Sequence, residues 1–202
     1  MKNNLVKVIF KSIIKEKYVV IKSFNPNDFE KGRDIDIFCY SIGQLKDNII
    51  NSINKITVEN NLNIIVKNFQ NHCHLDINDQ SGLLIRFDLF DKIPNYQRIN
   101  IRDSLFDIIL ETKQSKIYDE IEYYSANINF NNLIRYIEYI EYFYNENNKI
   151  KHLNFLEDNL KNDIDFYRNI HYYITFPFEK TQPKRKLSMK DLKGLLDKVK
   201  QT

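Results

Sequence analysis

The 202-residue chain contains no tryptophan and is poor in cysteine, glycine and proline. Its two cysteines, Cys39 and Cys73, are too few for a disulfide framework, so a reducing compartment is the simpler assumption. No stretch approaches the roughly 18 apolar residues that span a bilayer. Lysines interrupt the short apolar run around residues 8–10, which excludes a signal peptide. We therefore expect a cytoplasmic protein without a membrane span.

Several motifs of well-known enzyme classes are also missing. No segment matches the phosphate-binding pattern Gly-x-x-x-x-Gly-Lys, and there is no dinucleotide-binding glycine fingerprint. No serine or cysteine lies in the glycine-flanked context of a nucleophile elbow. These absences argue against P-loop, Rossmann-type and serine-hydrolase chemistry.

The residues that are present predict a soluble α+β protein in three parts. Helix-period and strand-period patterns predict the order helix, strand, strand, helix, strand, strand, strand up to about residue 95. From Asp103 onward the pattern is mainly helical. The fold class is thus a mixed β-sheet core (1–95) followed by a helical C-terminal half (96–180) and a basic tail (181–202).

Charge is distributed unevenly along the chain. The net charge is +3, but the residues from Lys180 onward carry eight Lys or Arg and two Asp, so the rest is slightly acidic. The basic tail is compatible with binding nucleic acid, anionic lipid or an acidic protein patch. A solvated, partly ordered terminus is the simpler interpretation and the one we favour.

Two aspartates on one predicted strand form the most informative motif. Asp34 and Asp36 alternate with Ile35 and Ile37, so the acids point to one face and the isoleucines to the core. At about 5 Å and an effective dielectric of about 20, the two charges repel by about 3 kcal/mol. A fold does not usually keep such a pair without a cation.

A predicted hairpin supplies a third acid. With Ile77 opposite Leu83, His74 lies opposite Arg86, and His72 opposite Asp88. The odd-numbered positions then form an apolar face, and the other face collects histidine, arginine and aspartate: Cys73, Leu75, Ile77, Ile85, Phe87 and Leu89 against His72, His74, Asp76, Arg86 and Asp88. We expect Cys73, Leu75, Ile85, Phe87 and Leu89 to be buried, and Arg86 and His74 to lie outside the apolar core. We also expect Asp34, Asp36 and Asp88 to converge on one cleft, with carboxylates close enough to share metal.

Three carboxylates arranged in this way suit two-metal phosphoryl transfer, in which a pair of Mg²⁺ ions lies about 3.5–4 Å apart. The segment resembles the polymerase β-like nucleotidyltransferase superfamily, whose strand ending in Gly-Gly or Gly-Ser precedes Asp-x-Asp by nine to thirteen residues. Here Ser23 precedes Asp34-Ile35-Asp36 by ten residues, and Phe87-Asp88-Leu89 matches the third acid. The resemblance covers residues 5–93. Lys22 stands where the family has glycine.

The resemblance implies a function and a set of site residues. Asp34, Asp36 and Asp88 would be the catalytic metal ligands for Mg²⁺ or Mn²⁺, and Lys22, Ser23, Arg33, Arg86 and His74 would contact the nucleoside triphosphate substrate. The expected reaction moves a nucleoside monophosphate from NTP to a hydroxyl or phosphate acceptor. A loose similarity to uncharacterised bacterial proteins of surface-polysaccharide loci favours a sugar or another small molecule over nucleic acid.

Other interpretations of the same residues stay open. The acids could lie on an exposed strand with no shared role, or the chain could be a non-catalytic binding module of the same fold. A toxin or defence enzyme that modifies tRNA or protein is a third possibility. His72-Cys-His74-Leu-Asp76 resembles the His-x-His-x-Asp of zinc hydrolases, but Ile77 stands where that motif continues with histidine.

Overall fold

The structure is a computed structural model that describes residues 2–22, 32–96, 99–118, 120–142, 150–160 and 172–175. Ser23, most of the polar loop after it and the basic tail lie outside the described residues. Within the described residues, the secondary-structure elements follow one another in this order: α1 (Lys2–Ile13), β1 (Tyr18–Val20), β2 (Arg33–Cys39), α2 (Ile42–Asn60), β3 (Asn63–Asn68), β4 (His72–Asp79), β5 (Gly82–Phe90), β6 (Asn100–Ile101), α3 (Ser104–Glu111), β7 (Gln114–Tyr118), β8 (Ile121–Ser125), α4 (Ile128–Tyr142), α5 (Ile150–Leu160) and β9 (Ile174–Thr175).

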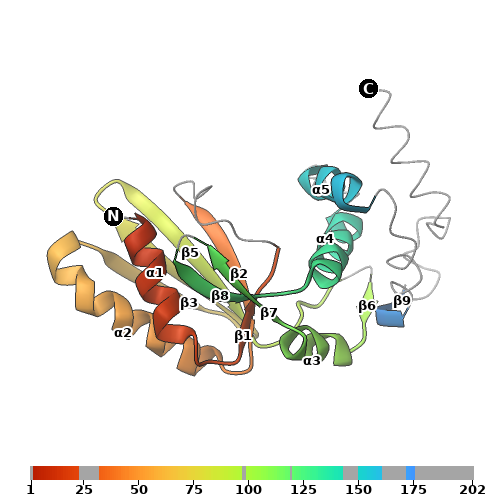
Figure 1. Ribbon diagram of the computed structural model, residues 1–202, viewed down its shortest axis with the longest axis horizontal. Helices are drawn as coiled ribbons and strands as arrows, with labels where there is room; N and C mark the ends of the chain where they lie inside the picture. The colour runs from red at the N-terminus through yellow and green to blue at the C-terminus, as the bar shows by residue number, and fades with distance from the viewer. Residues whose placement is uncertain are drawn as a thin grey trace. The chain divides into compact units, whose positions relative to one another are not determined.

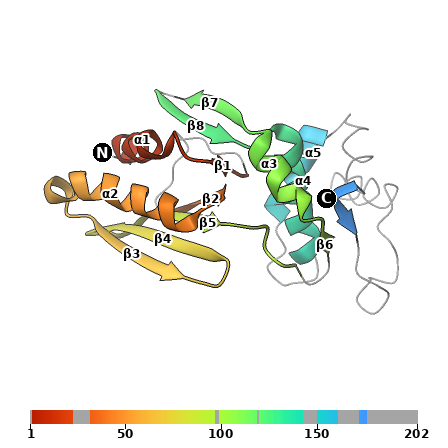
Figure 2. The same cartoon turned by 90° about the horizontal axis from the view of Figure 1, so that it is seen from below.

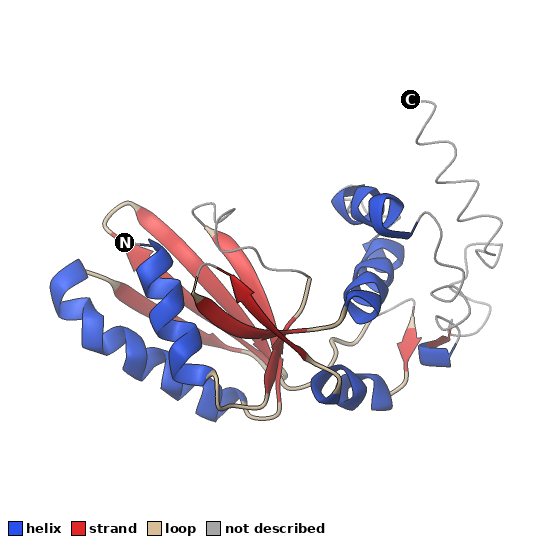
Figure 3. Ribbon diagram, viewed as in Figure 1, coloured by secondary structure: helices blue, strands red, loops and turns tan. Residues whose placement is uncertain are grey.

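Seven of the strands form one mixed sheet in the order β3-β4-β5-β2-β1-β8-β7. The pairs β2–β5 and β1–β8 are parallel, and the other neighbouring pairs are antiparallel. Helices α1 and α2 lie side by side along the sheet, as Figures 1 and 2 show. Figure 3 separates the strands from the helices by colour. The predicted α+β class and the order of the first seven elements are confirmed.

The hydrophobic core explains why α1 and α2 cover one face of the sheet. Apolar residues of α1 and α2 recur every three or four positions and pack on the strand residues that face them, among them Ile9, Phe10, Leu45, Ile49, Ile35, Ile37, Leu75 and Phe87. The five hairpin residues predicted to be buried are at most 1% exposed. We call the opposite face, which bears Asp34, Asp36 and Asp88, the acid face.

The β4–β5 hairpin has a different register from the one predicted. The turn is tighter, with Asp79 opposite Gly82, whose φ of +108° suits glycine. A bulge between Ile77 and Asn78 adds a second shift, so that His74 lies opposite Asp88, and Asp76 opposite Arg86. The predicted pairing of His74 with Arg86 and His72 with Asp88 is therefore wrong. A shift of one residue exchanges the two faces of a strand, and a second shift returns each side chain to its predicted face. The burial prediction was therefore right although the pairing was not.

The chain divides into two compact units. One comprises Met1–Pro94 with Phe106–Asn127 and holds the seven-stranded sheet; the other comprises Asn95–Leu105 with Ile128–Thr202. The expectation of a mainly helical chain after Asp103 missed β7 and β8, which return to the sheet. Within the second unit, Leu133, Ile134 and Leu156 are buried. No helix in the described part of the chain is long and apolar enough to cross a membrane.

Candidate functional site

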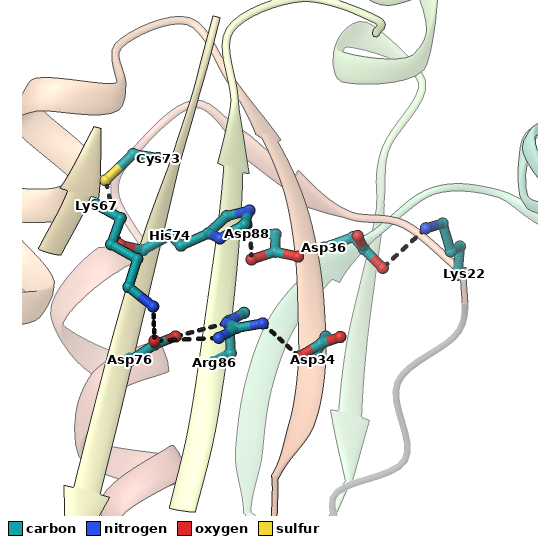
Figure 4. Close-up of polar contacts among 9 residues, drawn as sticks. All are labelled: Lys22, Asp34, Asp36, Lys67, Cys73, His74, Asp76, Arg86 and Asp88. Carbon is teal, nitrogen blue, oxygen red and sulfur yellow. Dashed lines mark hydrogen bonds and ion pairs between the residues drawn. The ribbon is translucent and has the colours of Figure 1, made fainter. Parts of the chain in front are cut away.

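The acid face carries three rows of side chains that run across β4, β5 and β2. Strand pairing places Asp76, Arg86 and Asp34 in the first row, and His74, Asp88 and Asp36 in the second. A third row consists of rings: His72, Phe90 and Phe38. Figure 4 shows the first two rows with Lys22 at one side and Lys67 at the other. Charged groups are thus bordered by aromatic ones along the strands.

The three predicted metal ligands share this face, and two of them are immediate neighbours. Asp36 lies opposite Asp88 in the parallel β2–β5 ladder, and Asp34 lies one row away. Neighbouring strands are about 4.8 Å apart, so the Asp36 and Asp88 side chains stand close together. Among the described residues, however, no group of three or more His, Cys, Asp or Glu side chains is placed so that it could hold a metal ion. Their role as metal ligands stays a prediction.

Each of these carboxylates faces a basic side chain of the protein itself. Lys22 Nζ lies 3.0 Å from Asp36 Oδ2, and Arg86 Nη1 lies 4.0 Å from Asp34 Oδ1. His74 Nε2 lies 3.6 Å from Asp88 Oδ1. The Lys22 and Asp36 side chains are only 18% and 17% exposed, whereas Asp34 is 51% exposed. The Lys22–Asp36 pair is therefore the better shielded from water, and its attraction is less screened.

Lys22 reaches Asp36 from an unusual backbone conformation. The Ile21 N–H donates to the Asp36 carbonyl at 3.0 Å, so the chain still follows β2 at the end of β1. At the next residue φ is +65°, in the left-handed region. A residue with a Cβ adopts this region at a cost of about 1 kcal/mol, while glycine enters it freely. The backbone thus has the form that glycine favours, although the residue is lysine.

Asp76 and Lys67 belong to the same charged network, although neither was predicted as a site residue. Arg86 donates to both Asp76 oxygens, with Nε–Oδ1 at 2.5 Å and Nη2–Oδ2 at 3.1 Å. Lys67 Nζ donates to Asp76 Oδ2 at 3.2 Å. The Arg86 hydrogen bonds hold the pKa of Asp76 below its usual value, although burial opposes them. Its place in the alternating β4 pattern was the signal that could have identified Asp76.

Arg86→Met is expected to destabilise the fold by about 3 kcal/mol, because it leaves the buried Asp76 carboxylate without its two-point partner. Lys67→Met is the matched control. It removes the ion pair between the half-exposed Lys67 side chain and the same carboxylate, so the free energy of unfolding should fall by less than about 1 kcal/mol. Urea denaturation of both variants measures the difference. Equal, small losses would show that Arg86 does not support Asp76.

Asp88 is the most perturbed acid of the site. Its Oδ1 is buried and accepts no hydrogen bond. Burial raises the pKa of Asp88 from 3.8 to about 7; the charges of Asp36 and Asp34 add to the increase, while Arg86 and Lys22 oppose it. Perturbed carboxyl groups of this kind are typical of functional sites but also occur in structural networks.

His74 does little to compensate for the charge of Asp88. Burial, His72 and Arg86 lower the pKa of His74, so the imidazole is neutral at pH 7. Its ring contacts two others, with centroids 4.9 Å from Phe69 and 5.0 Å from His72. Phe69 and His72 stack in parallel at 4.3 Å. His74 therefore belongs to a cluster of three rings beside Asp88.

The remaining predicted site residues are not gathered here. Strand alternation places Arg33 on the face of Ile35 and Ile37, opposite to that of the acids, at the first position of β2. Ser23 lies outside the described residues. The site that the structure brings together therefore consists of Lys22, His74 and Arg86 with the three acids.

The donor set fits a hard divalent cation. Mg²⁺ and Mn²⁺ prefer carboxylate oxygens, and the buried Asp88 oxygen has no hydrogen-bond donor of its own. Asp36, on the neighbouring strand, could bind the same ion only if the metal replaced Lys22 as the partner of its carboxylate. The donor types are thus suited to the cation, although the described side chains are not placed as a three-ligand site. Lys22 is the group that competes with the cation for Asp36.

Comparisons with known proteins give little further guidance. No protein-family model matches the chain, and no curated protein matches it either. Among solved structures, the chain is similar to an antigenic nucleotidyltransferase-like protein from Paracoccidioides brasiliensis. The match has a TM-score of 0.41 and 11% sequence identity over 98% of this chain and 87% of that one. A similarity of this strength establishes neither a family nor an activity for this chain.

Proposed function

We propose that the protein is a metal-dependent nucleotidyltransferase with a polymerase β-like core. It would move a nucleoside monophosphate from NTP to a hydroxyl or phosphate acceptor, with a sugar or another small molecule as the acceptor. The observation that carries the proposal is the pair Asp36–Asp88. The two acids lie directly opposite each other in the parallel β2–β5 ladder, and the buried Oδ1 of Asp88 accepts no hydrogen bond. Asp34 extends the group by one row.

The side chains of the acid face have separate roles in this proposal. Asp34, Asp36 and Asp88 would hold Mg²⁺ or Mn²⁺, which when bound would neutralise charge on the triphosphate. Lys22 and Ser23 would bind phosphate oxygens. His74, neutral at pH 7 and 3.6 Å from Asp88, is suited to accept a hydrogen bond from the acceptor hydroxyl. Arg86, fixed by Asp76, would keep Asp34 in place.

The proposed reaction is compatible with a reducing compartment, for which we propose the cytoplasm. Cys39 and Cys73 are both free and buried in the core. Burial raises the pKa of the Cys39 thiol to about 12, so it stays protonated and unreactive. Neither cysteine takes part in the proposed chemistry.

A nucleotide and metal screen by thermal denaturation tests the proposal. We expect one or more NTPs to raise the melting temperature only when Mg²⁺ or Mn²⁺ is present. At a ligand concentration about 100-fold above Kd, binding stabilises by about 2.7 kcal/mol, roughly 5–10 °C for a chain of this size. Absence of any metal-dependent shift across the four NTPs would contradict the proposal.

A non-catalytic binding module is the second candidate, and one observation favours it. Lys22 and Arg86 lie beside Asp36 and Asp34, as in a site where protein cations have replaced metal. Such a module would bind its ligand equally well in EDTA. A nucleotide affinity that does not depend on divalent cations would therefore favour the binding module over the enzyme.

A further inference from the structure

The Lys22–Asp36 ion pair is formed at a backbone cost. Lys22 holds φ at +65°, and its Nζ reaches Asp36 Oδ2 at 3.0 Å in a partly shielded position. Strained conformations of this kind persist where the surroundings stabilise them, and they cluster at functional sites. The attraction between the ammonium group and the Asp36 carboxylate is one such stabilising interaction.

The partner of this lysine is also a group that a divalent cation needs. Asp36 stands directly opposite Asp88, whose buried Oδ1 has no hydrogen-bond donor. An ammonium group on Asp36 neutralises one of the two neighbouring charges and occupies one carboxylate oxygen. A metal ion held by Asp36 and Asp88 would have to displace that group or bind against its charge. Both effects weaken metal binding.

We propose that Lys22 is a tethered counter-ion that blocks Asp36 until a divalent cation displaces it. The inference rests on the proposed function, because it concerns regulation of the same metal site. The displaced ammonium group lies one residue before Ser23 in the chain, where a triphosphate that enters with the metal can pair with it. Metal binding to Asp36 would release Lys22 for the triphosphate, and triphosphate binding to Lys22 would release Asp36 for the metal. Metal binding and triphosphate binding would therefore favour each other.

The affinity of the full chain for Mn²⁺ tests the proposal. The protein is titrated with Mn²⁺ at pH 8, and the free ion is measured by electron paramagnetic resonance. Lys22→Asn removes the charge and keeps a residue that tolerates positive φ. We expect Mn²⁺ to bind this variant at least tenfold more tightly than the wild type, or about 1.4 kcal/mol. Lys22→Gly, which relieves the backbone strain, should give the same gain. Lys22→Arg, which keeps the charge, should give none.

Lys67→Asn is the matched control. It removes another lysine of the acid face whose ion pair, 3.2 Å long, goes to Asp76 rather than to the three acids. Its Mn²⁺ affinity should equal that of the wild type, which separates a local block from a general change in charge. Adding Asp36→Asn to Lys22→Asn should abolish the gain and so locate the ion.

The outcomes separate the inference from the function on which it rests. If Mn²⁺ binds the wild type, Lys22→Asn and Lys22→Gly with the same Kd, the metal site stands and the counter-ion proposal is overturned. An equal gain in Lys67→Asn overturns it as well. If Mn²⁺ binds none of the proteins, the metal site itself is wrong and both proposals fall.

Discussion

Asp36→Ala is expected to abolish nucleotidyl transfer and the Mg²⁺-dependent stabilisation by NTP, while the protein stays folded. Loss of a ligand that holds the metal against the reacting phosphate should reduce the rate on the order of 10³-fold or more. Transfer is measured as pyrophosphate release from NTP, and binding as the metal-dependent shift in melting temperature. Both readouts should fall together if Asp36 is a metal ligand.

The stability of Asp36→Ala without metal provides a second, independent readout. The substitution removes the repulsion between Asp36 and Asp88, but it also removes the ion pair with Lys22. These effects oppose each other, so the melting temperature in EDTA should stay level or rise slightly. A core aspartate held by hydrogen bonds would instead leave donors unsatisfied, at a cost of roughly 1–3 kcal/mol. Asp47→Ala, an exposed acid on α2, is the control and should retain the full response to NTP and Mg²⁺.

A variant that loses stability in EDTA and still responds to NTP with Mg²⁺ would show that Asp36 is not a metal ligand. In that case Lys22 and Asp36 would form a structural pair only. The proposal of Lys22 as a blocking counter-ion would fall with it, because that proposal requires Asp36 to bind metal.

The faces of the strands could be predicted from the sequence because they depend on alternation alone. Ile35 and Ile37 are buried and Asp34 and Asp36 are not, as their spacing predicts. Cross-strand neighbours depend on the turn and on bulges, which the sequence marks weakly. The two-residue turn and the bulge beside Ile77 moved His74 from Arg86 to Asp88. The side chains that reach the acid face were therefore predictable, whereas their partners were not.

The cations of the site illustrate the same limit. Lys67 is on the edge strand β3, whose residues are mostly exposed, and only the strand order places it beside Asp76. Lys22 was recognised as standing in a glycine position, but its contact with Asp36 depends on a positive φ that a lysine seldom adopts. Such contacts arise from tertiary geometry, which local patterns do not encode.

Strands β7 and β8 were missed because they have little apolar alternation. The β7 segment Gln-Ser-Lys-Ile-Tyr is almost entirely exposed, as suits the edge of a sheet. In β8 the buried positions are Ile121, Tyr123 and Ser125, a set that includes only one aliphatic side chain. What stabilises this pair is the parallel contact of β8 with β1, between segments more than 100 residues apart.

In the absence of metal, we expect the stability of Asp88→Asn relative to the wild type to be higher at pH 8 than at pH 4. The pKa of Asp88 is raised in the folded state, from 3.8 to about 7. Below pH 3.8 the carboxyl group is protonated in both the folded and the unfolded chain. Between pH 3.8 and 7 the unfolded chain loses this proton more readily, so wild-type stability falls as the pH rises. Three pKa units correspond to an effect on the order of 4 kcal/mol, and asparagine does not titrate.

Asp76→Asn supplies a control of opposite sign from the neighbouring row. Arg86 lowers the pKa of Asp76, so the ionised carboxylate stabilises the fold above pH 3.8, and that stability is lost as the pH falls through the folded pKa. Urea denaturation in EDTA at pH 4, 6 and 8 gives the free energy of unfolding of each variant relative to wild type. With rising pH this difference should become more favourable for Asp88→Asn and less favourable for Asp76→Asn. Any constant effect of the amide group cancels in the pH dependence. Two curves with the same slope would mean that the charge of Asp88 is already compensated in the folded protein, leaving no reason for its buried oxygen to attract a cation.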